Sequence, residues 1–369
     1  MKDSAGPRSP TLTDVAREAG VSVGTVSHVV SGARHVRPET RIRVERAIAL
    51  LRFRPNRVAR SLISDRTNTV AVVIPDVANP FFADLIRGAE DVFDAAEIVI
   101  AFRSSDNSSA TQRRHLQSFL ERRVDGVILA VAADADPNEL HDLAERGPVV
   151  LVDRVPRGWE GDTVRGDDLL AMELVVNHLF SLGHRKIALV NGDIGLSTAL
   201  GRENGFRTSM ATLGLSPHCI SSGSFTLQSG LDQALNHLAS SDPPTAICAA
   251  NDLLALGTLA AARRLGLSVP GDLSVTGLDD ITYADLASPP LTTVAQPAYT
   301  MGATAARLVL QRLEDRSRAG RLDPRQEVIL KPTLVPRQST GSPTRGPAGD
   351  GGDSRATLQH GDTAEPGTN

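Results

Sequence analysis

Polar and aromatic side chains follow several apolar runs of this sequence, and their types suit the binding of a small molecule. Asp153 ends VLVD, Asn251 follows AICAA, and Asp279 follows SVTGL. Carboxylates accept hydrogen bonds from paired hydroxyl groups, while rings such as Phe81 and Phe82 stack on a sugar or base face. Groups at the carboxyl ends of parallel strands are where α/β sheets bind ligands.

The chain carries no signature of catalysis. It contains no H-E-x-x-H motif and no Walker loop. Its two cysteines, Cys219 and Cys248, exclude a disulfide scaffold and a CxxC metal site and suit a reducing cytoplasm. His184 stands just before an apolar run and is expected to cap or pack. We therefore predict no enzyme, no cofactor and no metal ion.

A second set of candidate residues lies near the N-terminus, in a predicted helix-turn-helix. Thr13, followed by Asp14, predicts a helix start, and Gly20 predicts its end. Ser22 is expected to cap a second helix over about 23–31. In such a motif the second helix enters the major groove of DNA, and its first residues meet base edges. The exposed candidates there are Val23, Gly24, Thr25, Ser27 and His28.

Charge is distributed unevenly along the chain. Residues 1–66 hold 13 Lys and Arg against 6 Asp and Glu, a net of +7, whereas the whole chain has a net charge of −4. A basic head on an acidic body suggests a nucleic-acid module joined to another domain. Within this head, Pro38 predicts the start of a third helix.

The body alternates apolar runs with helical stretches, which predicts βαβ units and parallel sheets. About 270 residues of this pattern exceed one sheet, so we expect two α/β subdomains. The chain contains no apolar run of about 20 residues, and its N-terminus has no apolar stretch typical of a signal peptide. The final residues are rich in Gly, Pro, Thr and Asp and are expected to be disordered. The strands are expected at 69–75, 98–102, 124–131, 148–152, 187–191, 245–250 and 273–278; the helices are expected at 82–95, 109–122, 168–182, 229–239, 252–265 and 298–314.

The segments DVAREAGVS, TVSHVV, TRIRVERAI and PNRVARSL occur in the order and spacing of the lactose/galactose-repressor family, which this chain resembles. The resemblance implies an all-α helix-turn-helix head with a hinge helix, a two-lobed α/β domain like a periplasmic binding protein, and a disordered tail. The implied divisions are a flexible N-terminus at 1–10, the head at 11–55, the hinge and linker at 56–68, the lobes at 69–338 and the tail at 339–369.

The resemblance also implies which residues contact DNA. His28 stands where many members have Arg, and a single His contact with a base is weaker than a bidentate Arg contact. In the hinge, Leu62 takes the place of a leucine that wedges between central base pairs, and small Ala59 allows two hinge helices to approach. The remaining expected contacts, mostly to phosphates, are Thr13, Arg37, Asn56 and Arg57.

For the lobes, the resemblance implies an effector cleft. Its expected lining is Phe81, Phe82, Asp153, Arg202, Asn251, Asp279 and Gln296. Asp252 and Asp280 have a simpler interpretation as helix caps.

These features favour a cytoplasmic, sequence-specific regulator of transcription, most simply a repressor. Its partners are double-stranded operator DNA, a small effector (a sugar, sugar phosphate or nucleoside) and a second copy of the chain, with no membrane. The resemblance implies a homodimer interface on the outer faces of both lobes, including the helix near 82–96. An alternative is a solute-binding receptor without a DNA role, which the basic head opposes. An enzyme of sugar metabolism is a further alternative, which the missing catalytic signature opposes.

Overall fold

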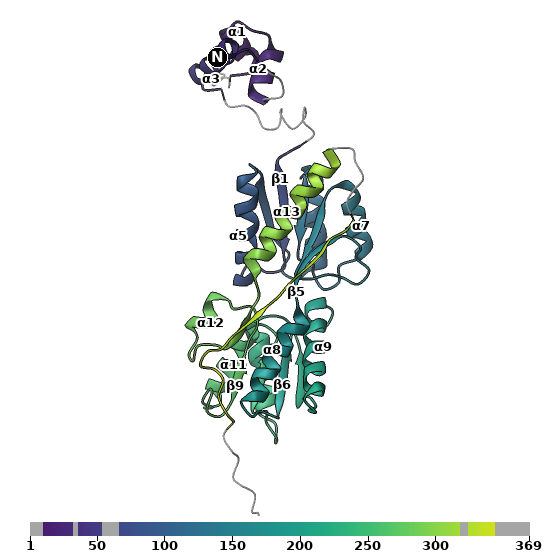
Figure 1. The fold of residues 1–369 in the computed structure, drawn as a ribbon, viewed down its shortest axis with the longest axis vertical. Helices are drawn as coiled ribbons and strands as arrows, with labels where there is room; N and C mark the ends of the chain where they lie inside the picture. The colour runs from purple at the N-terminus through teal and green to yellow at the C-terminus, as the bar shows by residue number, and fades with distance from the viewer. Residues whose placement is uncertain (1–9, 32–35, 54–65, 318–323, 344–369) are drawn as a thin grey trace, which may run out of the picture.

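The computed structural model describes residues 10–31, 36–53, 66–317 and 324–343. These residues form a helical head and two α/β lobes arranged along the long axis of the molecule (Figure 1). Among them, no helix is both long and apolar enough to cross a bilayer.

The head consists of α1 (Leu12–Ala19), α2 (Val23–Ser31) and α3 (Pro38–Leu50). Gly20 ends α1 at a φ of 64°, a left-handed conformation that glycine adopts without a Cβ penalty. Ser22 accepts the Thr25 N–H at 3.1 Å, which confirms the predicted cap of α2. Three short helices therefore share one small core, made of Val15, Ala16, Ala19, Val26, Val44, Ala47 and Phe53.

The predicted cap of α1 is wrong by two residues. Thr11, not Thr13, is the N-cap, because Thr11 and Asp14 bond each other reciprocally in a capping box. Thr13 lies inside the first turn with an exposed side chain. The Thr-x-x-Asp spacing from Thr11 was present in the sequence and is the signal for this motif.

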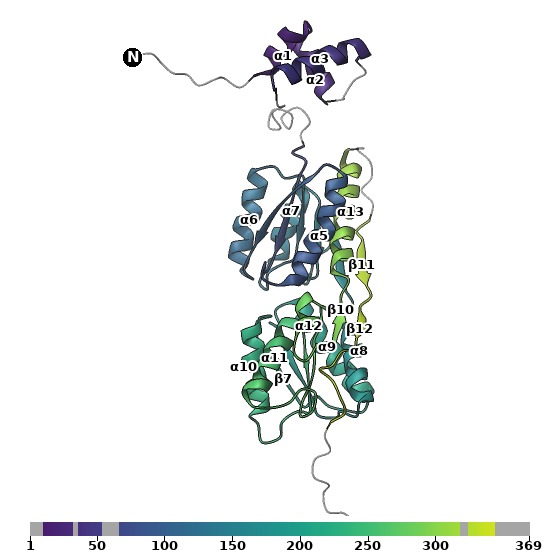
Figure 2. The same cartoon turned by 90° about the vertical axis from the view of Figure 1, so that its left-hand side faces the viewer.

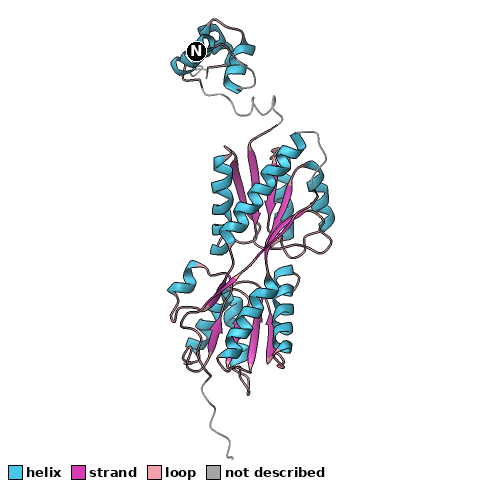
Figure 3. Ribbon diagram, in the orientation of Figure 1, coloured by secondary structure: helices cyan, strands magenta, loops and turns pink. Residues whose placement is uncertain are grey.

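The N-terminal lobe contains a six-stranded, all-parallel sheet with the strand order β11-β5-β4-β3-β1-β2. Its strands are β1 (Thr69–Ile74), β2 (Val99–Ser104), β3 (Gly126–Leu129), β4 (Val149–Val152), β5 (Asp162–Gly166) and β11 (Glu327–Leu330); its helices are α5 (Pro80–Ala95), α6 (Ser109–Glu121), α7 (Pro137–Arg146) and α13 (Ala298–Ser317). Helices cover both faces of the sheet (Figure 3).

Strand β1 explains why this sheet is apolar on both sides. Successive strand residues point to opposite faces, so Val70 and Val72 pack with α5 and α13, whereas Ala71 and Val73 pack with α6 and α7. The continuous β-branched run was predicted to be a strand buried on both faces, and the structure confirms this.

The C-terminal lobe has a four-stranded parallel sheet with the order β7-β6-β8-β9. Its elements are α8 (Asp168–Ser181), β6 (Ile187–Asn191), α9 (Ser197–Thr212), β7 (Cys219–Ser222), α10 (Leu227–Leu238), β8 (Ala246–Ala249), α11 (Asp252–Arg264), β9 (Ser274–Thr276) and the short α12 (Thr282–Leu286). Cys248 is fully buried in β8, as expected of a small apolar residue.

The chain passes between the lobes three times: from β5 to α8, from β10 (Thr293–Ala295) to α13, and from β11 to β12 (Thr333–Val335). Strands β10 and β12 pair antiparallel beside the C-terminal lobe. In Figure 2 the last crossing runs along one side of both lobes. Elements distant in sequence thus complete each lobe.

The predicted tail begins too early. Ser339 is fully buried, donates to the Val275 carbonyl at 2.6 Å and accepts the Thr292 N–H at 2.8 Å. Buried His184 holds the next residues through the Gly341 carbonyl at 2.9 Å. Residues 339–341 therefore belong to the folded lobe, and 344–369 lie outside the described residues.

Helices α5 and α13 cross at two glycines that leave no room for a side chain. A Cβ on Gly88 would lie 1.9 Å from the Tyr299 carbonyl oxygen, and one on Gly302 would lie 1.8 Å from that of Leu85. The close crossing lets both helices lie on the same face of the sheet.

We expect Gly88→Ala to lower the free energy of unfolding by about 1–3 kcal/mol, because the added methyl forces the two helices apart. Asp94→Ala, at an exposed position of the same helix, is the control and should change it by less than about 0.5 kcal/mol. Chemical denaturation measures both. Equal effects of the two substitutions would contradict the close crossing.

We expect Thr11→Ala to destabilise α1 by about 1 kcal/mol, since it removes the hydroxyl that accepts the Asp14 N–H. Thr13→Ala is the matched control, because Thr13 makes no cap. Hydrogen exchange of the α1 amides, followed by mass spectrometry, should become faster only in Thr11→Ala. Faster exchange in Thr13→Ala alone would restore the original prediction.

Candidate DNA-binding and effector sites

The head presents the start of α2 to solvent. Val23 is 42% exposed, and Gly24 is exposed beside it. Ser27 and His28 are partly exposed further along the same helix, and the Thr25 hydroxyl lies 2.9 Å from that of Ser22. The structure therefore places these five predicted residues on one short helix with accessible polar atoms.

Arg37 is the N-cap of α3 and makes no side-chain cap bond there, so its exposed guanidinium extends from the head. The expected hinge contacts Asn56, Arg57, Ala59 and Leu62 lie outside the described residues.

Between the lobes, six of the seven predicted effector residues line one cavity. They are Phe81, Phe82, Asp153, Arg202, Asn251 and Asp279. The seventh, Gln296, lines the adjoining cavity of about 200 Å³, which shares Phe81 and Asp279 with the first. The central cavity has a free volume of only about 20 Å³, room for roughly one water molecule. Its own side chains fill it, so a larger ligand requires the lobes or these side chains to move.

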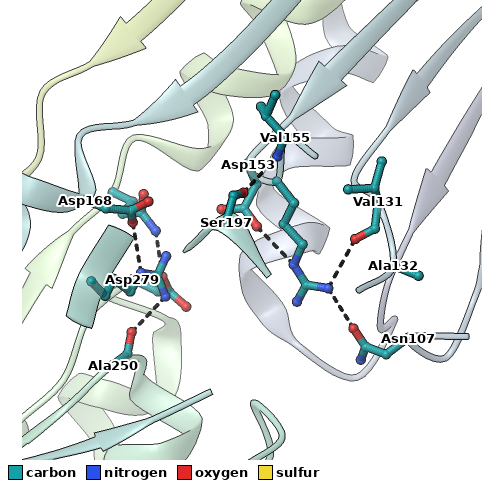
Figure 4. A network of polar contacts seen from close by, with 12 residues as sticks. Asn107, Val131, Ala132, Asp153, Val155, Asp168, Ser197, Ala250 and Asp279 are labelled. Atoms are coloured by element: carbon teal, nitrogen blue, oxygen red, sulfur yellow. Dashed lines mark hydrogen bonds and ion pairs between the residues drawn. The ribbon is translucent and has the colours of Figure 1, made fainter. Parts of the chain in front are cut away.

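Arg154 is the main residue that the sequence analysis missed. It is 4% exposed, donates from Nη1 to Asn107 Oδ1 at 2.6 Å and lies 3.6 Å from the Asp153 carboxylate (Figure 4). Its guanidinium faces the rings of Phe82 and Phe225 at 5.9 and 5.8 Å. The contact with Asp153 is made by Nε, and it is an ion pair too long to count as a hydrogen bond. A buried donor without a close hydrogen bond is costly, so a ligand acceptor near this atom would be favourable.

Arg202, on α9, joins two elements of the C-terminal lobe. It donates to Asp168 Oδ1 at 2.9 Å and to the Ala250 carbonyl at 2.7 Å. Burial raises the pKa of Asp168 to about 6, although Arg202 opposes the shift. This ion pair fixes the guanidinium beside Phe225 at 5.5 Å, where it forms one wall of the cavity.

Asp153 and Asp279 bring carboxylates to the cavity from opposite lobes. Both have positive φ, 61° and 125°, which costs backbone energy for residues other than glycine. Burial raises the pKa of Asp153, and it raises that of Asp279 well above the usual value, while nearby arginines oppose both shifts. Gln296 donates to Asp279 Oδ1 at 2.8 Å and so orients that carboxyl.

Asn251 lines the cavity as predicted, but it also takes the capping role that was expected of Asp252. Asn251 caps α11 by accepting the Leu254 N–H at 2.9 Å, while also lining the cavity. Asp252 is not a cap: it accepts the Ile281 N–H and the Thr293 hydroxyl at 2.9 and 2.6 Å. Asp280 likewise pairs with Arg337 rather than capping α12.

Other lining residues were missed for identifiable reasons. Thr198 lies on α9, and Phe225 lies between β7 and α10, but neither α9 nor β7 was predicted. Arg154 directly follows Asp153 in the run VLVDR, and that adjacency was the available signal. Asn79, which caps α5, also lines the cavity.

Comparison with known proteins assigns both parts of the chain. Residues 11–56 match the profile of bacterial regulatory proteins of the lacI family, and residues 176–340 match a periplasmic binding protein-like domain. The HTH-type transcriptional regulator DegA of Bacillus subtilis is 35% identical over 335 residues, covering 89% of this chain and 98% of DegA. The chain belongs to the lacI family.

Two further family members give the same picture. The transcriptional repressor PurR of Photobacterium profundum is 34% identical, covering 89% of this chain and 98% of its own. The lac repressor dimer bound to operator and an anti-inducer superposes with a TM-score of 0.79 at 29% identity, covering 90% of this chain and all of that one. The predicted fold class, head and lobes are thereby confirmed.

Asp252 should make stability depend on pH. Burial raises its pKa to about 6, above the unfolded value near 4, so the folded protein binds the extra proton. Its contribution, up to about 3 kcal/mol, is present at low pH and is lost as the pH rises from about 4 to 6. Wild type should therefore gain stability relative to Asp252→Asn as the pH falls from 7.5 to 5.

Thermal unfolding at several pH values tests this expectation, with Asp94→Asn as an exposed control. A constant difference between wild type and Asp252→Asn across this range would show that Asp252 does not titrate there.

Proposed function

We propose that this protein is a transcriptional repressor whose affinity for operator DNA is set by a small molecule bound between its two lobes. The observation that carries the proposal is one chain in which a lacI-type helix-turn-helix precedes a buried, polar cavity between α/β lobes. A solute-binding receptor without a DNA role leaves the head unexplained.

DNA recognition follows from the accessible start of α2. Val23 offers methyl groups to a thymine methyl, while Ser27 and His28 offer hydrogen-bonding atoms to base edges or phosphates. Exposed Arg37 supplies a charge to a phosphate and carries no base information. Two half-sites require two heads, and so the proposal includes a homodimer.

Effector recognition follows from the composition of the cavity. Asp153 and Asp279 accept hydrogen bonds from hydroxyl groups, Arg154 and Arg202 donate, and Phe82 and Phe225 supply apolar ring faces. A polyhydroxylated ring such as a sugar matches this alternation of apolar and polar faces. Among its relatives are a ribose operon repressor of Haemophilus influenzae, 33% identical, and a regulator determined with cellobiose. We therefore propose that the effector is a sugar rather than a nucleoside.

Coupling between the two sites follows from residues contributed by both lobes. Asp153 and Arg154 follow β4 of the N-terminal lobe, whereas Arg202 and Asp279 belong to the C-terminal lobe. A ligand that contacts both sets favours one angle between the lobes and thereby one spacing of the two heads. The protein thus acts without catalysis, in the cytoplasm where operator DNA resides.

Selection of bound duplexes from a random pool, with full-length protein at physiological salt, tests this function. We expect a near-symmetric site. Adding sugars, sugar phosphates or nucleosides should then shift its affinity in wild type but not in Arg154→Gln, which keeps operator binding. Recovery of no motif, both alone and with these compounds, would overturn the proposal.

Substitutions of His28 and of Arg37 should weaken DNA binding in different ways. His28→Ala should relax specificity at one base pair of each half-site by about 1–3 kcal/mol, since it removes a base contact. Arg37→Ala should weaken binding to all DNA sequences alike. It should also reduce the slope of log affinity against log salt concentration by about one for each head bound. Fluorescence anisotropy with matched and mutated duplexes at several salt concentrations separates them. An equal loss of affinity for all duplexes in His28→Ala would show that His28 contacts phosphates and not a base.

A further inference from the structure

A second cavity, apart from the one between the lobes, lies in the N-terminal lobe where strands β4 and β5 begin. Its volume is about 190 Å³, and residues of α7 and α13 form its sides. The effector cavity lies beyond the carboxyl ends of the same sheet, so the two cavities are at opposite ends of the strands. We call the second one the tryptophan pocket, after Trp159 in its lining.

The indole of Trp159 forms a rigid apolar wall of this pocket. Its ring stacks on that of His141 with the centroids 5.1 Å apart, and its Nε1 donates to the Asp162 carbonyl at 3.4 Å. A Cβ on Gly161 would lie 2.1 Å from Trp159 Cζ2, so the ring keeps this position only because residue 161 is glycine. The wall is therefore fixed before a ligand arrives, which lowers the entropic cost of binding.

Three further residues complete the apolar part of the lining: Ala144 on α7, and Pro148 and Val149 where β4 begins. Together with the indole they offer a surface that suits a flat ring. Typical sites for drug-sized ligands have about 300 Å³ or more. A volume of about 190 Å³ therefore has room for a single ring with a short substituent.

The polar part of the lining is positively charged. Arg312 is balanced by Asp162, to which it donates two hydrogen bonds of 2.7 Å. Arg316 and Arg325 form no ion pair with a carboxylate in the described part of the chain. Arg316 instead makes two long contacts of 3.4 Å with backbone carbonyls at the end of α7. The ends of α7 and α13 each add about half a negative charge, so about one positive charge stays uncompensated.

The lining is suited to an anionic group on the ligand. Asp162 is the one carboxylate among its described residues, and both carboxylate oxygens are engaged, since Oδ1 also accepts the Gln326 N–H at 2.8 Å. The planar fork of a guanidinium matches a carboxylate. A planar carboxylate also adds less volume to a ring than a phosphate does, which agrees with the small size of the pocket.

We propose that the tryptophan pocket binds a small aromatic carboxylate. The ring of the ligand lies against the indole of Trp159, and its carboxylate accepts hydrogen bonds from Arg316 and Arg325. The proposal concerns the N-terminal lobe alone and does not depend on the effector or operator roles of the other sites.

The chain has a built-in reporter for this pocket. Trp159 is its only tryptophan, and the side chain forms part of the lining. Anions that bind to the basic head do not approach it. Its fluorescence therefore separates binding in the pocket from binding to the head.

Full-length protein is titrated with sodium benzoate at constant ionic strength while Trp159 fluorescence and the heat of binding are recorded. We expect saturable binding. Benzamide, which lacks the charge, and acetate, which lacks the ring, should each bind at least about tenfold more weakly. No saturable signal with benzoate by either method, or equal binding of benzamide, would overturn the proposal. Tighter binding of phenyl phosphate than of benzoate would overturn the assignment of a carboxylate.

Two variants test whether benzoate binds in this pocket. Arg316→Gln/Arg325→Gln should weaken its binding at least about tenfold. The matched control is Arg263→Gln/Arg264→Gln, at two exposed positions of α11, which should leave the binding unchanged. Ala144→Leu keeps every charge and fills the pocket from α7, so it should abolish the binding. Unchanged binding in Ala144→Leu, or an equal loss in both arginine variants, would overturn the proposal.

Discussion

The lobes are joined by three crossings of the chain, and this constraint governs how the molecule can move. With three connections side by side, the lobes can change their angle but cannot slide far apart. Two of the crossings touch: a Cβ on Gly166 would lie 2.1 Å from Gln296 Oε1. Gln296 in turn orients Asp279 in the cavity. Bending at the crossings and the position of a ligand-binding carboxyl are thus mechanically linked.

The polar residues of the cavity illustrate why binding sites cost stability. Asp153, Asp279 and Arg154 are buried, the two aspartates have positive φ, and Arg154 Nε has a 3.6 Å ion pair with Asp153 in place of a hydrogen bond. Each feature is unfavourable by itself. A ligand that supplies the missing partners therefore gains binding energy from defects already present in the protein.

Much of the fold was predictable because its strands and helices follow strong local patterns. The run at 69–74 and the helix at 23–31 depend on periodicity and caps within the segment itself. The missed elements depend on contacts distant in sequence. Helix α9 lacks a clear apolar face in its sequence, because its buried side carries the polar Arg202 as well as Phe206. The short strand β5 is held in position by Arg312. Its guanidinium donates two hydrogen bonds of 2.7 Å to Asp162, which lies 150 residues away in the sequence.

The candidate site likewise contains residues that could be predicted from local patterns and residues whose roles depend on contacts distant in sequence. Residue types following strands, with the family resemblance, predicted six of the cavity residues, because the carboxyl ends of parallel strands converge. Arg154 was overlooked since its adjacency to Asp153 does not by itself distinguish an arginine that folds back into a cavity from one that extends into solvent. The cap of α11 was assigned to Asp252 for a similar reason: Asn and Asp both cap helices, and only the distant Thr293 and Ile281, which bond Asp252, leave the cap to Asn251.

Ser339, Thr340 and Gly341 cover buried groups of the C-terminal lobe, and this determines where the chain can be shortened or fused to a tag. These residues cover the backbone of Val275 and Thr292 and the ring of His184, at the end of the molecule opposite the head (Figure 2). A shortened chain that stopped before them would expose those groups to water. A fluorescent or affinity tag attached after residue 343 would sit far from the DNA-binding surface, which makes that end the natural attachment point for surface immobilisation.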